Sequence, residues 1–515
     1  MVIRRVLAPR IDFGALRREL GLPDSFPAAA QREADAAAGA PLPAAADRTD
    51  IPFVTVDPAA SRDLDQAMHL SRRPGGGFRV RYAIADVATH VRPGGALEEE
   101  TWRRGQTVYL PDGNVPLHPH TLSEGAASLL PDADRAAVLW TIDLDADGGT
   151  VGVALERARV RSRAKLDYVG VQLAAEAGRL PEPIALLPEI GALLTARGLR
   201  RGAVNLPLPE QDVEPDGDGW RLVLRGPSPM EDHNAQISLL TGMAAADIML
   251  AGRIGLLRTM PPPRPEAVQR LRQAAGPLGV HWPDGMPVGA VLAGLDASQP
   301  RAAAFVDQAA ELMRGAAYTA FDGELPEQPA HGGVAAAYAH VTAPLRRLAD
   351  RYATEACLAL HEGREVPDWV RAALSKLPEV MASTDRTASA ATRGAVELAE
   401  AVLLAHRVGE TFEAAVLDVD APRPAAEVPR QPATAEPPRP AGSAVDDRGR
   451  SGGNAGADRP GANGGRPGRP PGGTVALDEP PVRARCVGEL PLGERVRVRL
   501  VTADPAERKV LFERA

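Results

Sequence analysis

Cysteines and aromatic residues are scarce in this sequence. Among its 515 residues there are two cysteines, Cys357 and Cys486, which lie far apart. Two distant thiols supply neither a disulfide framework nor a cysteine-based metal site, and they suit a reducing compartment. Aromatic residues make up 4% of the chain, whereas Gly and Pro number 50 and 49. We attribute this amino-acid bias to the base composition of the genome rather than to function.

Long apolar runs are also lacking near the N-terminus, and positive charge is not in excess. Residues 1–10 are basic but no apolar segment follows them, so we expect no signal peptide, no membrane span and a cytoplasmic protein. The 59 Lys and Arg residues are outnumbered by 67 Asp and Glu, which gives a formal net charge of −8. This balance excludes a chain that coats nucleic acid indiscriminately, but it allows an enzyme with a local basic channel.

The pattern along the chain predicts three parts. Residues 1–50 contain a short helical stretch and an Ala/Pro-rich tract, and we expect an N-terminal extension with little core of its own. Residues 51–408 show strand signals followed by helical signals, which predicts an α+β catalytic domain. Residues 409–515 contain short alternating strands, which predict a small β-barrel. Residues 421–473 are rich in Pro, Gly, Ala and Arg, and this composition predicts a disordered insertion in that barrel.

Individual elements follow from hydrophobic periodicity. We expect strands at residues 51–56, 78–85, 137–143, 151–154, 411–418, 482–487, 494–501 and 509–513. We expect helices at residues 13–20, 235–257, 301–312, 347–360 and 382–406. Arg495, Arg497 and Arg499 alternate with apolar residues, so they share one strand face, which is either an RNA contact or a solvated surface.

Three carboxylates follow the first predicted strand within nine residues, namely Asp57, Asp63 and Asp65. Because like charges so close together repel each other, the arrangement requires a neutralising partner. Hard divalent cations with oxygen ligands, above all Mg²⁺, meet that need. Asp63 and Asp65 are two positions apart and would face the same way in an extended chain. The alternative is an Asp-rich surface turn, since Asp is common in loops.

Four segments spread over nearly three hundred residues resemble, in order and spacing, the ribonuclease II/R (RNB domain) family. They are Thr55–Ala67, which contains the acids, Tyr82–Leu130, Arg161–Tyr168, and Tyr338–Asp350 with its Pro344-Leu-Arg-Arg run. The resemblance covers about residues 51–400. It implies an RNB catalytic domain with a mixed sheet and surrounding helices, followed by an S1/OB-like β-barrel. It also implies a short form of the family that lacks N-terminal cold-shock domains.

The resemblance further implies a function and a set of site residues. The function is a monomeric, Mg²⁺- or Mn²⁺-dependent hydrolytic 3′→5′ exoribonuclease that degrades single-stranded RNA to nucleoside 5′-monophosphates. Paired divalent ions activate a water and stabilise charge in such a reaction. The implied metal ligands are Asp57, Asp63, Asp65 and Gln66; the implied catalytic residues are Asp65, Tyr109 and Arg346; the implied RNA contacts are Arg347, Lys165, Tyr168 and Asn234. Arg347 either supports Arg346 or binds a backbone phosphate. His118, His120 and His340 lie in matched segments, and we expect structural roles for them.

The chain departs from the family pattern at two of these positions. Gln66 stands where the family usually has a fourth acid, so the site loses one negative charge. Asn234 stands where the family typically has a Glu pair. These departures keep two alternatives open. One is a catalytically weak or inactive RNA-binding protein on the RNB fold, and the other is a metal-dependent phosphohydrolase of small nucleotides.

Overall fold

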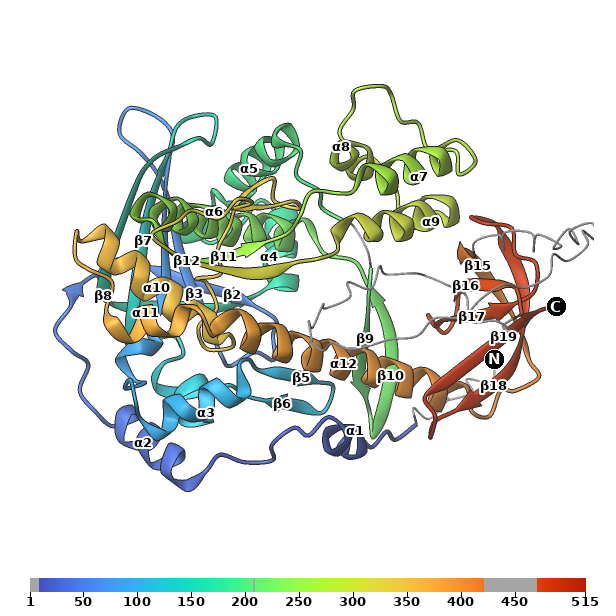
Figure 1. The fold of residues 1–515 in the computed structure, drawn as a ribbon, viewed down its shortest axis with the longest axis horizontal. Coiled ribbons are helices and arrows are strands. Elements are labelled where there is room, and N and C mark those ends of the chain that lie inside the picture. The colour runs from blue at the N-terminus through green and yellow to red at the C-terminus, as the bar shows by residue number, and fades with distance from the viewer. Residues whose placement is uncertain (1–8, 207–208, 421–469) are drawn as a thin grey trace, which may run out of the picture.

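The computed structural model describes residues 9–206, 209–420 and 470–515. A mixed β-sheet with surrounding helices lies at one end, a closed β-barrel lies at the other, and the long helix α12 runs between them (Figure 1). The described helices are α1 Gly14–Glu19, α2 Ala28–Ala38, α3 Ala96–Arg104, α4 Tyr168–Glu176, α5 Leu187–Arg201, α6 Pro229–Gly252, α7 Pro265–Ala275, α8 Val288–Ala293, α9 Pro300–Ala309, α10 Leu348–His361, α11 Asp368–Leu374 and α12 Leu377–Leu404.

The described strands divide among the sheet, several two-stranded ribbons and the barrel. They are β1 Ala46–Asp47, β2 Phe53–Asp57, β3 Gln66–Arg72, β4 Phe78–Ala85, β5 Val108–Leu110, β6 Gly113–Val115, β7 Asp134–Leu144, β8 Thr150–Asp167, β9 Glu210–Asp216, β10 Gly219–Arg225, β11 Ile254–Thr259, β12 Ala317–Asp322, β13 Ala330–His331, β14 Ala336–Ala337, β15 Thr411–Val419, β16 Gly472–Leu477, β17 Arg483–Val487, β18 Arg495–Asp504 and β19 Lys509–Arg514. The predicted α+β class is confirmed.

The main sheet is organised around the long strand β8. Six strands pair in the order β1-β8-β2-β3-β4-β7, and β8 also pairs with β7. The first part of β8 is antiparallel to β7, whereas its last residues run parallel to β2. One strand of 18 residues therefore joins both ends of the sheet. This closure fixes the C-terminal end of β2, where the acids begin.

Both faces of the sheet are buried. Along β4 and β7, Tyr82 and Trp140 face one core, while Ala83 and Leu139 face the other, as the two-residue period of a strand requires. The first core includes residues of α6 and α10, and the second includes Ala30 and its neighbours in α2. Strands buried on both faces are apolar at nearly every position, which is why the sequence signal over residues 78–85 is strong.

The N-terminal segment belongs to the catalytic body. The sequence predicts little core for residues 1–50, whereas the structure buries Phe13, Leu16, Ala30 and Ala34 of this segment against the rest of the chain. The Glu33 carboxylate accepts hydrogen bonds from two backbone N–H groups at the start of α3. Alanine-rich segments give a weak hydrophobic signal, but small side chains allow a helix to pack closely on its neighbours. The described part of this segment thus packs onto the catalytic body, and the expectation that it has little core of its own stays a prediction.

Helix α6 and strand β11 divide a region that the sequence predicts as one helix over residues 235–257. The helix begins earlier because Ser228 and Glu231 form a capping box with Pro229 in the first turn. It ends where Arg253 adopts a left-handed conformation with φ of 57°. The apolar residues that follow form β11, which pairs with β12. Helix α6 is long and apolar enough to cross a membrane, but ten of its residues are buried in this fold.

The C-terminal strands form a closed barrel in the order β15-β16-β17-β19-β18, as the sequence predicts for an S1/OB-like module. Most of the expected disordered insertion, residues 421–469, lies outside the described residues. Its last part forms the start of β16. Gly472 and Gly473 are required there, because a Cβ would lie 2.2 Å from the Cys486 carbonyl oxygen and 2.0 Å from the Asp418 carbonyl oxygen.

The three arginines of β18 share an exposed face of the barrel, as the alternation predicts. Each is paired with an acidic side chain of a neighbouring segment. The pairs are Arg495 with Asp478, Arg497 with Glu413, and Arg499 with Glu513. Because these charges are compensated, this face favours the solvated-surface interpretation over an RNA contact.

Arg351 joins α10 to α3. Replacing it tests how much this buried contact contributes to the stability of the fold. This guanidinium in α10 is 3% exposed. It donates to Glu98 at 2.8 Å and to the Val91 carbonyl oxygen at 2.7 Å, and it lies over the Trp369 ring. We predict that Arg351→Ala lowers the free energy of unfolding by about 3–5 kcal/mol, because Glu98 would lose its buried partner. Urea denaturation followed by circular dichroism measures this change.

Arg103→Ala is the matched control. Arg103 lies on α3 and pairs with Glu100, but its side chain is 66% exposed. Exposed ion pairs contribute at most about 1 kcal/mol, so this variant should unfold close to wild type. Equal losses in the two variants would contradict the assigned role of Arg351.

Candidate active site

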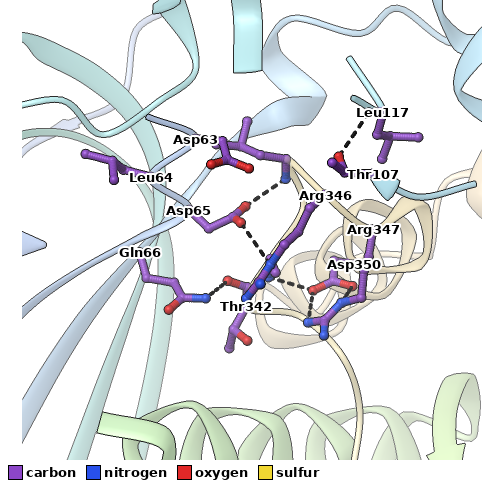
Figure 2. Close-up of polar contacts among 12 residues, drawn as sticks. Asp63, Leu64, Asp65, Gln66, Thr107, Leu117, Thr342, Arg346, Arg347 and Asp350 are labelled. Carbon is purple, nitrogen blue, oxygen red and sulfur yellow. Dashed lines mark hydrogen bonds and ion pairs between the residues drawn. The ribbon is translucent and has the colours of Figure 1, made fainter. Parts of the chain in front are cut away.

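The acid loop, defined as residues 57–66, connects β2 to β3 and is anchored at its centre by Leu64. The Leu64 side chain is fully buried in the second core. Its backbone N–H donates to Ser128 Oγ at 3.0 Å, and its carbonyl oxygen accepts from the Leu129 N–H at 3.0 Å. Asp63 and Asp65, on either side of Leu64, point away from this core (Figure 2). The prediction that the two acids face the same way is confirmed.

Lys165 holds the first half of the acid loop. Its Nζ atom donates to the carbonyl oxygens of Ala59 and Ser61, at 2.7 Å and 2.5 Å. Because β8 runs parallel to β2, Lys165 lies beside the loop that leaves β2. The predicted RNA contact of Lys165 is therefore not supported by its geometry, since the ammonium group already serves the loop backbone.

Asp65 connects the acid loop to a distant segment. We call residues 339–347, which precede α10, the arginine loop. Asp65 is 4% exposed, and its Oδ1 atom accepts from the Leu345 N–H at 2.7 Å. Its Oδ2 atom lies 3.5 Å from Arg346 Nε (Figure 2). Burial raises the pKa of Asp65 well above its ordinary value, and Arg346 and the Leu345 N–H act in the opposite direction.

Arg346 is the only one of these partners with a substantial exposed surface. Its side chain is 46% exposed, against 5% for that of Asp65. Burial alone would lower its pKa, but the neighbouring Asp65 carboxylate more than compensates and the pKa is raised. The guanidinium therefore stays charged. One edge contacts Asp65, and the remaining donors are available to an anion from solvent.

The arginine loop is held on its other side by residues 105–118. The Arg346 carbonyl oxygen accepts from the Thr107 N–H at 2.9 Å, and the Leu348 N–H donates to the Gly105 carbonyl oxygen at 2.9 Å. His118 Nδ1 lies 3.0 Å from the Leu345 carbonyl oxygen. Burial lowers the pKa of His118 to about 4, so the neutral ring donates from Nδ1. The structural role expected for His118 agrees with this contact.

Arg347 belongs to the support of the arginine loop. Its Nε and Nη2 atoms donate to both carboxylate oxygens of Asp350, at 2.9 Å and 2.8 Å, and Asp350 also accepts from the Ala343 N–H (Figure 2). A guanidinium that donates to both oxygens of one carboxylate fixes the position of the backbone around it. Of the two expected roles of Arg347, this arrangement favours support of Arg346 over contact with a backbone phosphate.

Tyr109 lies on the exposed side of the acids. It is the middle residue of β5, its surface is 47% exposed, and its hydroxyl donates to Asp63 Oδ2 at 2.6 Å. Burial of the hydroxyl end raises its pKa, and the Asp63 charge adds to this effect. The phenol therefore remains a neutral donor. The structure thus brings Tyr109, Asp63, Asp65 and Arg346 together, as the sequence predicts.

Asp57 has an oxygen without a partner. It is the last residue of β2, and its Oδ2 atom is buried without any hydrogen bond. Burial raises the pKa of Asp57 to about 6, the Arg346 charge lowers it, and the Asp63 charge raises it. A buried carboxylate oxygen with no donor is costly unless a cation or a proton satisfies it. This atom fits the donor set of a divalent cation.

The side chain of Gln66, a predicted metal ligand, is hydrogen-bonded within the protein. Its Nε2 atom donates to the Thr342 carbonyl oxygen at 2.5 Å (Figure 2), and its Oε1 atom accepts from the Tyr82 hydroxyl at 2.8 Å. Both polar ends are thus used within the protein. Within the described part of the chain, no three His, Cys, Asp or Glu side chains are gathered closely enough to hold a metal ion as they stand. The structural observation that points to a cation is thus the unpartnered Oδ2 atom of Asp57, which lies near the other acids.

Tyr168 and Asn234 lie together, close enough to Asp57 for its charge to act on the Tyr168 hydroxyl. Asn234 Nδ2 donates to the Tyr168 hydroxyl at 3.0 Å, and Asn234 Oδ1 is buried without a partner. Their predicted RNA contacts stay predictions. Sequence reasoning missed Thr342 and Ser238, which complete the contacts of Gln66 and Tyr82. Thr342 acts through its backbone carbonyl, for which the sequence carries no signal.

Comparisons with known proteins agree with this architecture. Residues 46–360 match the RNB domain, and residues 464–515 match the RNase II-type exonuclease C-terminal S1 domain. Ribonuclease R of Vibrio cholerae is 27% identical over 460 residues, which cover 81% of this chain and 54% of that protein. The chain spans about half the length of the curated relatives it matches.

Two solved structures show the same fold at low sequence identity. Mycoplasma genitalium RNase R in complex with ribose methylated single-stranded RNA has a TM-score of 0.78 and 18% identity, covering 98% of this chain and 77% of that one. Yeast Ssd1, a pseudonuclease, has a TM-score of 0.60 and 17% identity, covering 73% of this chain and 48% of that one. Since the RNB match takes in more than half of the 515 residues, this protein belongs to the RNB domain family.

Proposed function

We propose that this chain is a metal-dependent hydrolytic 3′→5′ exoribonuclease that degrades single-stranded RNA to nucleoside 5′-monophosphates. The observation that carries the proposal is the half-exposed Arg346 guanidinium, held 3.5 Å from the buried Asp65 on the side where Asp63 and Tyr109 also lie. Membership of the RNB family supports it, as does the name of the curated relative, ribonuclease R.

Arg346 would bind the scissile phosphate. A planar guanidinium with free donors matches two phosphate oxygens and stabilises the charge that develops on them. Asp65 and the backbone contacts of the arginine loop fix the group before substrate arrives. A donor that is already oriented costs no reorganisation when the reaction occurs. This preorganisation is the main catalytic contribution that the chain itself makes.

The acids and Tyr109 would hold the other participants. Asp57, Asp63 and Asp65 would hold a divalent cation, which when bound activates a water and neutralises charge on the phosphate. Tyr109 fixes the orientation of Asp63 through its hydroxyl. The exposed part of its ring is available to the terminal base, since an aromatic face stacks on any base. That contact would be tolerant of sequence.

One observation favours a second candidate, an RNA-binding protein without catalytic activity. Gln66 replaces the acid expected beside Asp65 and is bonded at both ends within the protein. The RNB fold also occurs in yeast Ssd1, whose description is a pseudonuclease. This candidate predicts RNA binding without turnover.

The direct test of the proposed function uses 5′-labelled single-stranded RNA with Mg²⁺ or Mn²⁺. We expect a ladder of products that shorten from the 3′ end, release of nucleoside 5′-monophosphates, and loss of both in Asp65→Asn. RNA that is bound but intact under both metals would favour the inactive candidate. Equal turnover of dinucleotides and long RNA would favour a phosphohydrolase of small nucleotides.

Arg346→Gln tests the guanidinium. We predict that it lowers kcat about 10²–10³-fold, as the loss of a preorganised donor to a developing charge does in other enzymes. Arg371→Gln is the matched control, because Arg371 has 47% side-chain exposure and pairs with Asp322 at 2.9 Å on α11. It should leave kcat unchanged. Equal losses in single-turnover assays would contradict the role of Arg346.

Asp57→Asn tests the unpartnered acid through stability. The pKa of Asp57 is about 6 in the folded chain and about 3.9 when unfolded. A raised pKa means that the stabilisation from protonation is complete below about pH 4 and is lost as pH rises through 6. Asn carries no charge, so we predict in EDTA that the variant matches wild type near pH 4 and is about 1–3 kcal/mol more stable above pH 7. Denaturant unfolding across this range measures the difference, and a difference that does not vary with pH would contradict the prediction.

A further inference from the structure

Gln66 links four elements of the catalytic body. It is the first residue of β3, and it donates to the Thr342 carbonyl oxygen in the arginine loop. Its Oε1 atom accepts from Tyr82 on β4, whose hydroxyl lies 2.9 Å from Ser238 Oγ on α6. The Gln66 side chain therefore forms one bridge across the space between the sheet and the arginine loop (Figure 2).

The contact with Thr342 requires a donor. A backbone carbonyl oxygen can only accept, so the amide nitrogen must face it and the amide oxygen must face Tyr82. A carboxylate at this position would place two acceptors against each other. The residue that departs from the family pattern is thus the residue type that this contact demands.

The Tyr82 side fixes the amide in place. Tyr82 is fully buried, so its hydroxyl cannot turn to water and must be satisfied by Gln66 and Ser238. A buried hydrogen-bonded network of this kind is rigid when every member is satisfied. Turning the Gln66 carbonyl oxygen toward the acids would remove the donor to the Thr342 carbonyl oxygen and leave the Tyr82 hydroxyl with Ser238 alone.

Gln66 and Asp65 hold two points of the same loop. Asp65 accepts from the Leu345 N–H, and Gln66 donates to the Thr342 carbonyl oxygen three residues earlier. Between these points the chain turns so that the Ala343 N–H reaches Asp350. Arg346 follows directly, so its position depends on both contacts.

We propose that Gln66 is a positioning residue that fixes the arginine loop, and that it takes no part in holding the divalent cation. The proposal rests on the proposed function, because it concerns the group that grips phosphate. It means that position 66 contributes no metal ligand, and that the charge lost there is exchanged for order in the loop that carries Arg346.

The test compares Gln66→Met with wild type by three measurements. Met has a similar length but neither donates nor accepts at the amide position. We expect the affinity for Mn²⁺, measured by electron paramagnetic resonance, to stay within about twofold. We expect amide hydrogen exchange at residues 343–347 to become at least tenfold faster. We expect kcat to fall about 10–100-fold with little change in KM, as displacement of a catalytic group by a fraction of an ångström does.

Gln66→Glu and Asp57→Asn complete the design. Glu keeps an acceptor for Tyr82 but cannot donate to Thr342, so we expect the same faster exchange. Asp57→Asn should weaken Mn²⁺ binding at least tenfold while leaving exchange at residues 343–347 unchanged. Melting curves identify any variant that does not fold, and exchange is then read from the other substitution.

Two results would overturn the proposal. If Gln66→Met weakens Mn²⁺ binding as much as Asp57→Asn does, Gln66 is a ligand. If exchange at residues 343–347 is unchanged in both Gln66 variants, Gln66 does not position the loop. Wild type that cleaves no RNA would overturn the proposed function separately, since the exchange measurement still decides the role of Gln66.

Discussion

The structure of the site depends on one buried carboxylate. Asp65 joins the acid loop to the arginine loop, 280 positions away, by accepting from the Leu345 N–H and pairing with Arg346. Burial of a carboxylate costs free energy, and the Leu345 N–H and the Arg346 charge offset part of that cost. The same contact that closes the fold therefore places the guanidinium. Stability and the position of the Arg346 guanidinium depend on a single interaction.

The neighbouring Asp57 shows the opposite balance. Its Oδ2 atom is buried without a donor, which costs stability in the absence of a cation. The surroundings compensate elsewhere, since Lys165 ties the loop backbone, Leu64 anchors its centre, and Arg347 with Asp350 holds the facing segment. A rigid frame around one unsatisfied group is the arrangement expected of a binding site rather than of a core. These contacts hold the two loops, and with them the acids, in position.

Much of the site could be predicted because its chemistry is carried by side chains. The sequence predicts a shared site for Asp63, Asp65, Tyr109 and Arg346, because each belongs to a motif whose order and spacing are visible in the sequence. Other parts acted through the backbone or through packing. The Thr342 carbonyl determines what Gln66 can do, and Arg253 in a left-handed conformation ends α6 before β11, yet neither has a residue-type signature. The alanines of α2 bury well because they are small, which a hydrophobicity pattern undervalues.

The position of α1 has a consequence for how the molecule is made. Phe13 packs edge-on against Trp220, Leu16 lies against Gly394 of α12, and Glu19 pairs with Arg508 between two strands of the barrel. Helix α1 and its flanking residues thus contact segments that lie from 95 positions later, at Asp112, to 489 positions later, at Arg508. Contacts of such long sequence separation form late and slowly. The burial of Phe13 and Leu16 is therefore complete only once β10 and α12 have folded against them.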